Sequence, residues 1–241
     1  MKIALCSKRF INNDVYSNLN TILQLMEQED SSIDLMCFGE AFLQGFDSLS
    51  WKYEIDQNIA VAQDSSVINK IRTKARENEI GVSFGYIEKE GTNIYSSYLV
   101  LSKTGETIIS FRRVSAGWKE PIADYHYKEG TSFEKFVIDN LSFSVGLCGD
   151  LWDESNVEAV SKCCAELVLW PVYLDYSISK WNESEKHKYA LQAKRFGKKV
   201  LLINSICDGE SKAKGASAFF SGGKIIYESS MGSENILVVE V

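Results

Sequence analysis

The strongest constraint on the fold is a regular alternation of strand-like and helix-like segments along the chain. Residues 2–7 and 33–40 are short apolar runs typical of strands. Between them lies a predicted amphipathic helix, residues 15–28, with apolar side chains at helical spacing: Leu19, Ile22, Leu23 and Met26. The order repeats downstream, with helices predicted at 65–79, 155–165 and 183–196 and strands at 80–88, 166–172 and 199–206. This pattern predicts an α/β protein whose sheets carry helices on their outer faces.

Hairpin signals are interspersed with this alternation. The strand-like runs 95–102 and 106–114 flank the turn residues 103–105, and residues 133–148 hold two strands around Asp139 and Asn140. The C-terminal run 215–230 contains a Gly-Gly turn, and residues 235–241 form a last strand. The sheets should therefore combine parallel and antiparallel pairs.

Composition limits both the domain count and the partners. A chain of 241 residues with 45% hydrophobic content can bury its core in one domain, residues 1–241. The net charge of -7 and the pI near 5.1 disfavour nucleic acid and anionic membranes as partners. The apolar start before Lys8 is too short for a signal peptide, and no run reaches transmembrane length, so we expect a cytoplasmic protein.

The cysteines and histidines show no metal-ligand spacing. Six cysteines occur without a C-x-x-C pair, and His126 and His187 stand apart from them, so we expect no metal site. Most of the thiols should be small buried hydrophobes. Cys164 in particular is predicted to face the core from helix 155–165, together with Val157 and Val160.

Three predicted strands end in residues that could carry chemistry: Glu40, Arg113 and Cys148. In open α/β sheets, reactive groups gather where the carboxyl ends of strands turn outward. Taken singly, each residue has an ordinary structural interpretation. Glu40 could cap a turn, Arg113 could be a solvated charge and Cys148 could be part of the core.

Together, these residues and their motifs resemble the nitrilase or carbon-nitrogen hydrolase superfamily. The resemblance runs from MCFGEAFLQGF around Glu40 through Gly85, Gly105 and GLCGDLWDE around Cys148. It continues through LVLWP, with Trp181 ten residues beyond Pro171, and through GASAFFSGGKII. It implies a four-layer α-β-β-α sandwich, a glutamate, lysine and cysteine active site, a small amide as substrate and a homodimer.

The chemistry of amide hydrolysis explains why such residues would be needed together. A free cysteine near neutral pH is mostly thiol, so Cys148 needs a base, the role implied for Glu40. The oxyanion that develops on the substrate needs a cation and a backbone N–H, for which Gly149 is well placed by sequence. Trp152 and Tyr173 are further candidates for substrate contacts. This chemistry requires neither a metal nor an organic cofactor.

The lysine motif of the family is altered in this chain. The family pattern is aromatic-x-Lys-x-His-Leu, whereas the chain has SFRRVSAGWKE, with Arg113 at the lysine position and Ser115 at the histidine position. Arginine keeps the positive charge but does not readily give up a proton. Lys119 is the alternative cation, although the spacing favours Arg113.

A second glutamate, present in many relatives, is also missing from its expected place. Seven residues before Gly130 stands Ala123, with Asp124 beside it and Glu120 slightly earlier. Either acid could substitute, or both could be solvated loop charges. The aromatic residues of the region are candidates for pocket walls or for ordinary packing: Trp118, Tyr125, Trp152, Tyr173 and Trp181.

We therefore predict a thiol hydrolase of a small amide, with Glu40, Arg113 and Cys148 as catalytic residues. An amide is favoured over a nitrile because amidases dominate the superfamily that the chain resembles. The altered lysine motif favours one alternative, a catalytically inactive relative that binds a small ligand or another protein. Transfer of the acyl group to an amine instead of water is a third interpretation.

Overall fold

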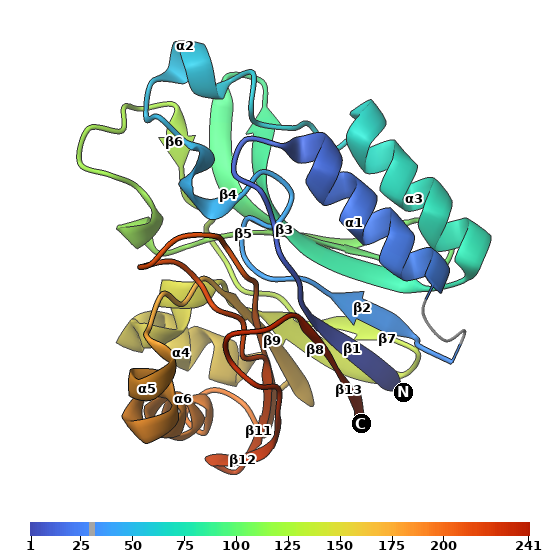
Figure 1. Ribbon diagram of the computed structural model, residues 1–241, viewed down its shortest axis with the longest axis vertical. Helices are drawn as coiled ribbons and strands as arrows, with labels where there is room; N and C mark the ends of the chain where they lie inside the picture. The colour runs from blue at the N-terminus through green and yellow to red at the C-terminus, as the bar shows by residue number, and fades with distance from the viewer. Residues whose placement is uncertain (29–31) are drawn as a thin grey trace.

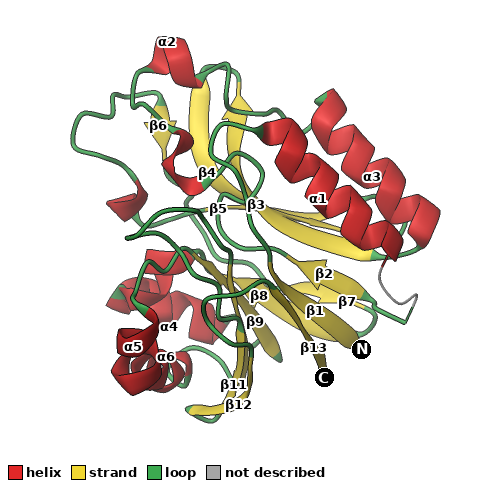
Figure 2. Cartoon of the chain, viewed as in Figure 1, coloured by secondary structure: helices red, strands yellow, loops and turns green. Residues whose placement is uncertain are grey.

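The computed structural model describes residues 1–28 and 32–241 and has four layers. Two sheets pack against each other, and a layer of helices covers the outer face of each (Figure 1). Coloured by secondary structure, the strands form the middle of the molecule and the helices its two outer sides (Figure 2). The predicted α-β-β-α sandwich is confirmed.

The first sheet contains both chain ends. Its strand order is β13 (Asn235–Glu240), β1 (Lys2–Ser7), β2 (Leu35–Cys37), β3 (Gly81–Glu90), β4 (Asn93–Leu101) and β5 (Thr107–Arg112). The short strand β6 (Tyr127–Lys128) pairs with β4. Strands β1, β2 and β3 run parallel, whereas β3, β4 and β5 pair antiparallel, and β4–β5 is the predicted hairpin around residues 103–105.

The second sheet repeats the combination of a parallel centre and antiparallel edges. Its order is β12 (Lys224–Glu228), β11 (Ala218–Ser221), β10 (Lys199–Asn204), β9 (Leu167–Val172), β8 (Leu141–Val145) and β7 (Phe136–Ile138). Strands β8, β9 and β10 are parallel. As a result, β2 and β8, which precede Glu40 and Cys148, lie in different sheets.

Helices α1 (Val15–Gln28) and α3 (Ser66–Asn78) cover the first sheet, and α4 (Glu154–Lys162) and α6 (Lys186–Ala193) cover the second. α3 begins where the Ser65 side chain accepts a hydrogen bond from the Ile68 N–H. The remaining short helical segments are α2 (Tyr53–Asp56), α5 (Ile178–Lys180), a π-turn at Trp181–Glu185, and 3-10 turns at Phe46–Ser48, Ala116–Trp118 and Cys148–Trp152.

The central core lies between the two sheets, because the parallel strands are apolar on both faces. Leu5 and Cys37 of the first sheet and Val145, Leu169 and Ile203 of the second are all buried there. Separate clusters of apolar residues pack each helix layer on its sheet. The loops that leave the two sheets are thereby fixed against each other.

The local predictions hold with three exceptions. Only Leu35–Cys37 of the predicted strand 33–40 is extended in a sheet, because the chain turns before Glu40. The predicted helix 183–196 is interrupted by the π-turn, and α6 ends at Ala193. The prediction for Cys164 was wrong: α4 ends at Lys162, and Cys164 is exposed with φ of +49°.

Candidate active site

Glu40 lies in a tight turn after β2 that is packed directly on β3. A Cβ on Gly85 of β3 would lie 2.3 Å from the Ala41 nitrogen and 2.7 Å from the Gly39 oxygen, so only glycine allows this approach. The Gly85 N–H donates to Gly39 O at 3.1 Å. Ala41 has φ of +49°, and Glu40 is only 1% exposed. The turn therefore holds a carboxylate inside the protein.

Cys148 lies in a comparable turn after β8. Its φ of +43° is unusual for a residue with a Cβ, and such conformations cost about 1–3 kcal/mol. The Trp170 indole N–H donates to the Cys148 carbonyl at 3.0 Å, and the 3-10 turn Cys148–Trp152 follows. Strained backbone of this kind clusters at functional sites, so the conformation of Cys148 marks it as a candidate functional residue.

The Arg113 side chain meets Glu40 in the interior. Arg113 Nη1 donates to Glu40 Oε1 at 2.7 Å, and the two side chains are 5% and 1% exposed. Arg113 Nε donates to Ser115 Oγ at 3.0 Å. The other carboxylate oxygen, Glu40 Oε2, is buried and accepts no hydrogen bond from the described residues. The pair thus leaves one oxygen of a buried carboxylate unused.

The charges of this pair act directly on Cys148. Burial, and after it the charge of Glu40, raise the pKa of the Cys148 thiol to about 12. The charge of Arg113 and the Tyr173 backbone N–H act in the opposite direction. Burial alone would lower the pKa of Arg113, but the charges of Glu40, Cys148 and Asp150 raise it overall. At neutral pH the resting site therefore contains a neutral thiol beside an arginine cation.

Asp150 connects the two loops that carry Arg113 and Cys148. Its buried carboxylate accepts the N–H groups of Val114 at 3.1 Å and Ser115 at 2.6 Å through Oδ1. Through Oδ2 it accepts the Leu147 N–H at 3.0 Å. Burial raises the pKa of Asp150 to about 6, against the opposing effect of its hydrogen bonds and of Arg113. Asp150 thus fixes the cation and the cysteine relative to each other.

Lys119, the alternative cation, is occupied elsewhere. Its ammonium forms an ion pair with Glu129 and donates to Tyr127 O at 3.2 Å. Lys119 nevertheless lines a cavity of about 250 Å³ that reaches Glu40. Cys148 and Arg113 are not among the residues that line this cavity. The structure therefore brings Glu40, Arg113 and Cys148 together and leaves Lys119 at the cavity wall.

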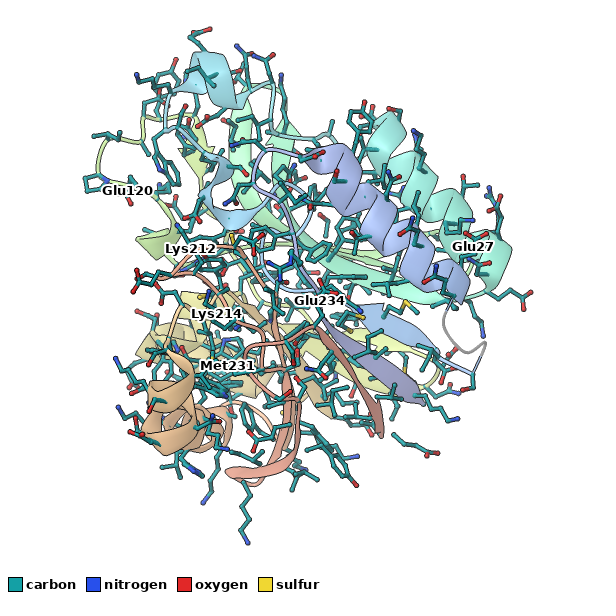
Figure 3. All side chains as sticks on the ribbon, viewed as in Figure 1. Glu27, Glu120, Lys212, Lys214, Met231 and Glu234 are labelled. Carbon is teal, nitrogen blue, oxygen red and sulfur yellow. The ribbon has the colours of Figure 1, made fainter. Side chains whose placement is uncertain are left out.

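Only one of the two candidate acids, Glu120 and Asp124, lines this cavity. Glu120 lines it, whereas Asp124 pairs with His126 and does not. Asp47 also lines the cavity and binds Lys212, which comes from the loop after β10, at 2.8 Å. Glu120 and Lys212 extend from different halves of the sandwich on the same side of the view (Figure 3).

Of the aromatic residues predicted as pocket walls, some lie at the site and others lie away from it. Tyr173 stacks on Phe46, with ring centroids 4.1 Å apart, and its N–H lies at Cys148. Trp118 lines the cavity. Trp152 is 44% exposed and packs on Trp170 and Tyr189 outside the cavity lining. Tyr125 is exposed beside His126, and Trp181 is buried in the core beneath the second sheet.

Two features of the site were missed in the sequence. Asp150 was part of the cysteine motif, but nothing in the sequence indicated that it binds the Arg113 loop. Trp51, a cavity wall with φ of +61°, is held by the buried Asp56, which accepts its N–H at 2.8 Å. The turn residues around Ser50 were the only signal for this contact.

The sequence model of the family described as carbon-nitrogen hydrolase matches residues 2–241. The chain belongs to the carbon-nitrogen hydrolase family. Among curated proteins it is 28% identical over 169 residues to a cyanide hydratase of Botryotinia fuckeliana (strain T4), covering 64% of this chain and 44% of that protein. A cyanide hydratase of Microdochium sorghi is 27% identical over 175 residues, covering 66% and 46%. The chain thus spans less than half of the length of these relatives.

Solved structures of other proteins share this fold. A cysteine-to-alanine mutant of the Nesterenkonia AN1 amidase, from the nitrilase superfamily, matches with a TM-score of 0.82 at 19% identity, covering 100% of this chain and 90% of that one. A glutamine-dependent NAD+ synthetase from Acinetobacter baumannii matches with a TM-score of 0.80 at 18% identity, covering 98% and 44%. At these identities the likeness concerns the fold alone.

Among the described residues, 1–28 and 32–241, no helix is both long and apolar enough to span a bilayer. The same residues contain no cluster of three or more His, Cys, Asp or Glu side chains suited to hold a metal ion.

Proposed function

We propose that this protein hydrolyses a small amide through a thioester on Cys148, with Glu40 as general base and Arg113 as the oxyanion-binding cation. The observation that carries the proposal is the buried Glu40–Arg113 pair beside the Cys148 thiol. A base, a cation and a nucleophile from three separate loops meet there, and one carboxylate oxygen has no partner among the described residues.

The reaction follows from these positions. Glu40 takes the thiol proton as sulfur attacks the amide carbon, and Arg113 with the Gly149 N–H holds the resulting oxyanion. When the tetrahedral intermediate collapses, the carbon-nitrogen bond breaks, and the protonated Glu40 passes its proton to the departing amine. Glu40 then deprotonates a water that attacks the thioester. The acid leaves, and the proton returns to sulfur, which restores the thiol.

The high pKa of the Cys148 thiol fits a base that acts during attack. A thiol with a pKa of about 12 is hardly ionised at neutral pH, so a preformed thiolate is not the resting nucleophile. The proton must move to Glu40 as the sulfur–carbon bond forms. Arg113 cannot serve as the proton acceptor, because its pKa is raised above the already high value of arginine.

The cavity beside Glu40 supports a small substrate. Its volume of about 250 Å³ is slightly below the usual range of ligand pockets, and Phe46, Trp51 and Trp118 contribute aromatic walls. Variants of the Nesterenkonia amidase have been solved in complex with acrylamide and with butyramide, and small amides are the substrate class that we propose. The cyanide hydratase relatives make a nitrile the first alternative to test.

Product formation tests this proposal. The purified protein should release ammonia and a carboxylic acid from at least one member of a panel of short aliphatic and aromatic amides. Cys148→Ala should abolish the release, whereas Cys164→Ala, which removes an exposed thiol, should leave it unchanged. Ammonia release that persists in Cys148→Ala would contradict the mechanism. Turnover of nitriles, with no turnover of any amide, would show that the substrate is a nitrile.

A further inference from the structure

The Arg113 guanidinium has three nitrogens, and two of them already have partners. Nη1 donates to Glu40 and Nε donates to Ser115. Nη2 donates no hydrogen bond to any residue that the structure describes, and it is not among the buried unpartnered atoms. This nitrogen is therefore the arm of the cation that remains available to bind something else.

Nη2 lies against the backbone that follows the cysteine. A Cβ built on Gly149 would stand 2.6 Å from Nη2, well inside the contact distance of about 3.5–4 Å. The Gly149 N–H donates to no described acceptor. Gly149 has no positive φ, so the backbone conformation itself does not require glycine. The space occupied by Nη2 is the specific reason why a side chain does not fit here.

We propose that the absence of a side chain at Gly149 is what allows an arginine to serve as the cation of this site. Nη2 occupies the volume that a Cβ would take, next to the free Gly149 N–H, and the two donors bind the oxyanion together. Gly149 is thus a positioning residue for Arg113 as well as a backbone donor. This inference rests on the proposed function, in which Arg113 stabilises the oxyanion.

The size of a guanidinium explains the requirement. An ammonium is compact, whereas a guanidinium is a planar fork whose second arm must lie in the plane fixed by the other two nitrogens. Glu40 and Ser115 fix that plane here, so Nη2 can retreat from a Cβ only if Arg113 breaks one of these contacts or tilts. The displacement needed is about 1 Å.

Four variants test the coupling between the two positions. Gly149→Ala should lower kcat by about 10- to 100-fold, because a shift of about 1 Å at a reacting group has effects of that order. Arg113→Lys removes Nη2, so the double variant Arg113→Lys/Gly149→Ala should have nearly the activity of Arg113→Lys alone. Gly117→Ala is the matched control for kcat: its Cβ would lie 3.9 Å from the same Nη2, an ordinary contact, so its effect on kcat should be far smaller. Because Gly117 lines the cavity, any change it causes should appear in KM.

A second measurement does not depend on turnover. The charge of Arg113 lowers the pKa of the Cys148 thiol, so its displacement in Gly149→Ala should shift alkylation of Cys148 by iodoacetamide to higher pH. Peptide mapping separates Cys148 from the exposed Cys164. Adding Gly149→Ala to the Arg113→Lys variant should not shift the pH dependence of Cys148 alkylation any further.

The outcomes separate this inference from the proposed function. A wild-type protein that turns over no amide would refute the proposed function, but the alkylation profiles would still test the contact between Gly149 and Arg113. The inference would be overturned if Gly149→Ala changed kcat equally in the wild-type protein and in Arg113→Lys, or changed it in neither. A loss of kcat that Gly149→Ala causes only when residue 113 is arginine supports the inference.

Discussion

Two adjacent arginines, Arg112 and Arg113, each bind a buried glutamate, but the two pairs are built differently. Arg112 at the end of β5 donates to both oxygens of Glu88 at 2.9 Å, and Ser97 and Gln63 also donate to that carboxylate. Hydrogen bonds to Glu88 outweigh the effect of burial and lower its pKa.

The Glu40–Arg113 pair has a single hydrogen bond and an unused oxygen. A buried carboxylate oxygen that accepts no hydrogen bond lowers the stability of the folded protein. A carboxylate such as Glu88, whose two oxygens accept four hydrogen bonds, has no lone pair left to take a proton. We infer that Glu88–Arg112 fixes the edge of the first sheet, and that the incomplete Glu40–Arg113 pair leaves a carboxylate oxygen for the proposed reaction.

The largest predicted contrast is between the two glutamates. Glu40→Gln should lower kcat by about 100- to 10,000-fold, the usual contribution of a general base. It also removes the charged partner of the buried Arg113, so the free energy of unfolding should fall by about 3–5 kcal/mol. Glu88→Gln should instead leave kcat of the folded protein near the wild-type value and lower the free energy of unfolding by about 1–3 kcal/mol, because Arg112 loses its buried partner but keeps its ion pair with the exposed Glu90. Urea titration and steady-state kinetics measure both. If Glu88→Gln lost activity while keeping its stability, the division of roles would be wrong.

The arginines give the next contrast. Arg113→Ala should cost on the order of 2–4 kcal/mol of transition-state stabilisation, the scale for loss of an oxyanion donor. Arg113→Lys should retain much of the activity, because it keeps the charge next to Glu40. Arg112→Ala should reduce stability and leave kcat of the folded protein near the wild-type value. A larger kcat loss in Arg112→Ala than in Arg113→Ala would reverse the assignment.

Asp150 should show an intermediate effect, visible in both activity and pH dependence. Asp150→Asn places an amide NH₂ against a backbone N–H donor of Leu147, Val114 or Ser115, so we expect about a 10-fold loss of kcat as the two loops separate.

Asp150 should make the folded protein less stable as the pH rises. The folded-state pKa of Asp150 is about 6, above the ordinary value of 3.8, so the folded state retains this proton longer than the unfolded state. Its contribution to stability is fully present below about pH 3.8 and is lost as the pH rises through about 6. The difference in stability between wild type and Asp150→Asn should change over this window by on the order of 3 kcal/mol. A constant difference would show that Asp150 titrates normally.

Lys119 should give the smallest effect. It binds Glu129 and Tyr127 O and is 22% exposed, so Lys119→Ala should change the transition-state free energy by less than about 1 kcal/mol. Its place in the cavity wall predicts that any change appears in KM. If Lys119→Ala lost more kcat than Arg113→Ala, Lys119 would be the cation.

Much of this fold was predictable because its signals are local. The amphipathic spacing of Leu19, Ile22 and Met26 and the apolar runs of the parallel strands follow directly from which faces are buried. The turn before Glu40 and the π-turn at Trp181 were not predictable, because close packing between Gly85 and the Glu40 turn and between α6 and its sheet decides them. The expectation for Cys164 failed because α4 ends at Lys162, before this residue.

The site was predictable only through its motifs. Glu40 and Cys148 were singled out because two specific motifs contain them, and Arg113 because of its spacing. The contacts of Asp150 with the Arg113 loop join positions about 36 residues apart, which no local pattern records. The homodimer, the cytoplasmic location and the single domain over residues 1–241 stay predictions.

The most direct test of the central claim is the mass of the Cys148 peptide after a rapid acid quench of wild-type protein turning over its best amide. We predict a mass increase equal to the acyl group of the substrate, on Cys148 alone, with Arg113→Ala forming it more slowly. The adduct should vanish in Cys148→Ala. Steady turnover without any acyl mass on Cys148 in the first turnovers, or with the acyl group on another residue, would contradict a mechanism in which Cys148 is the nucleophile.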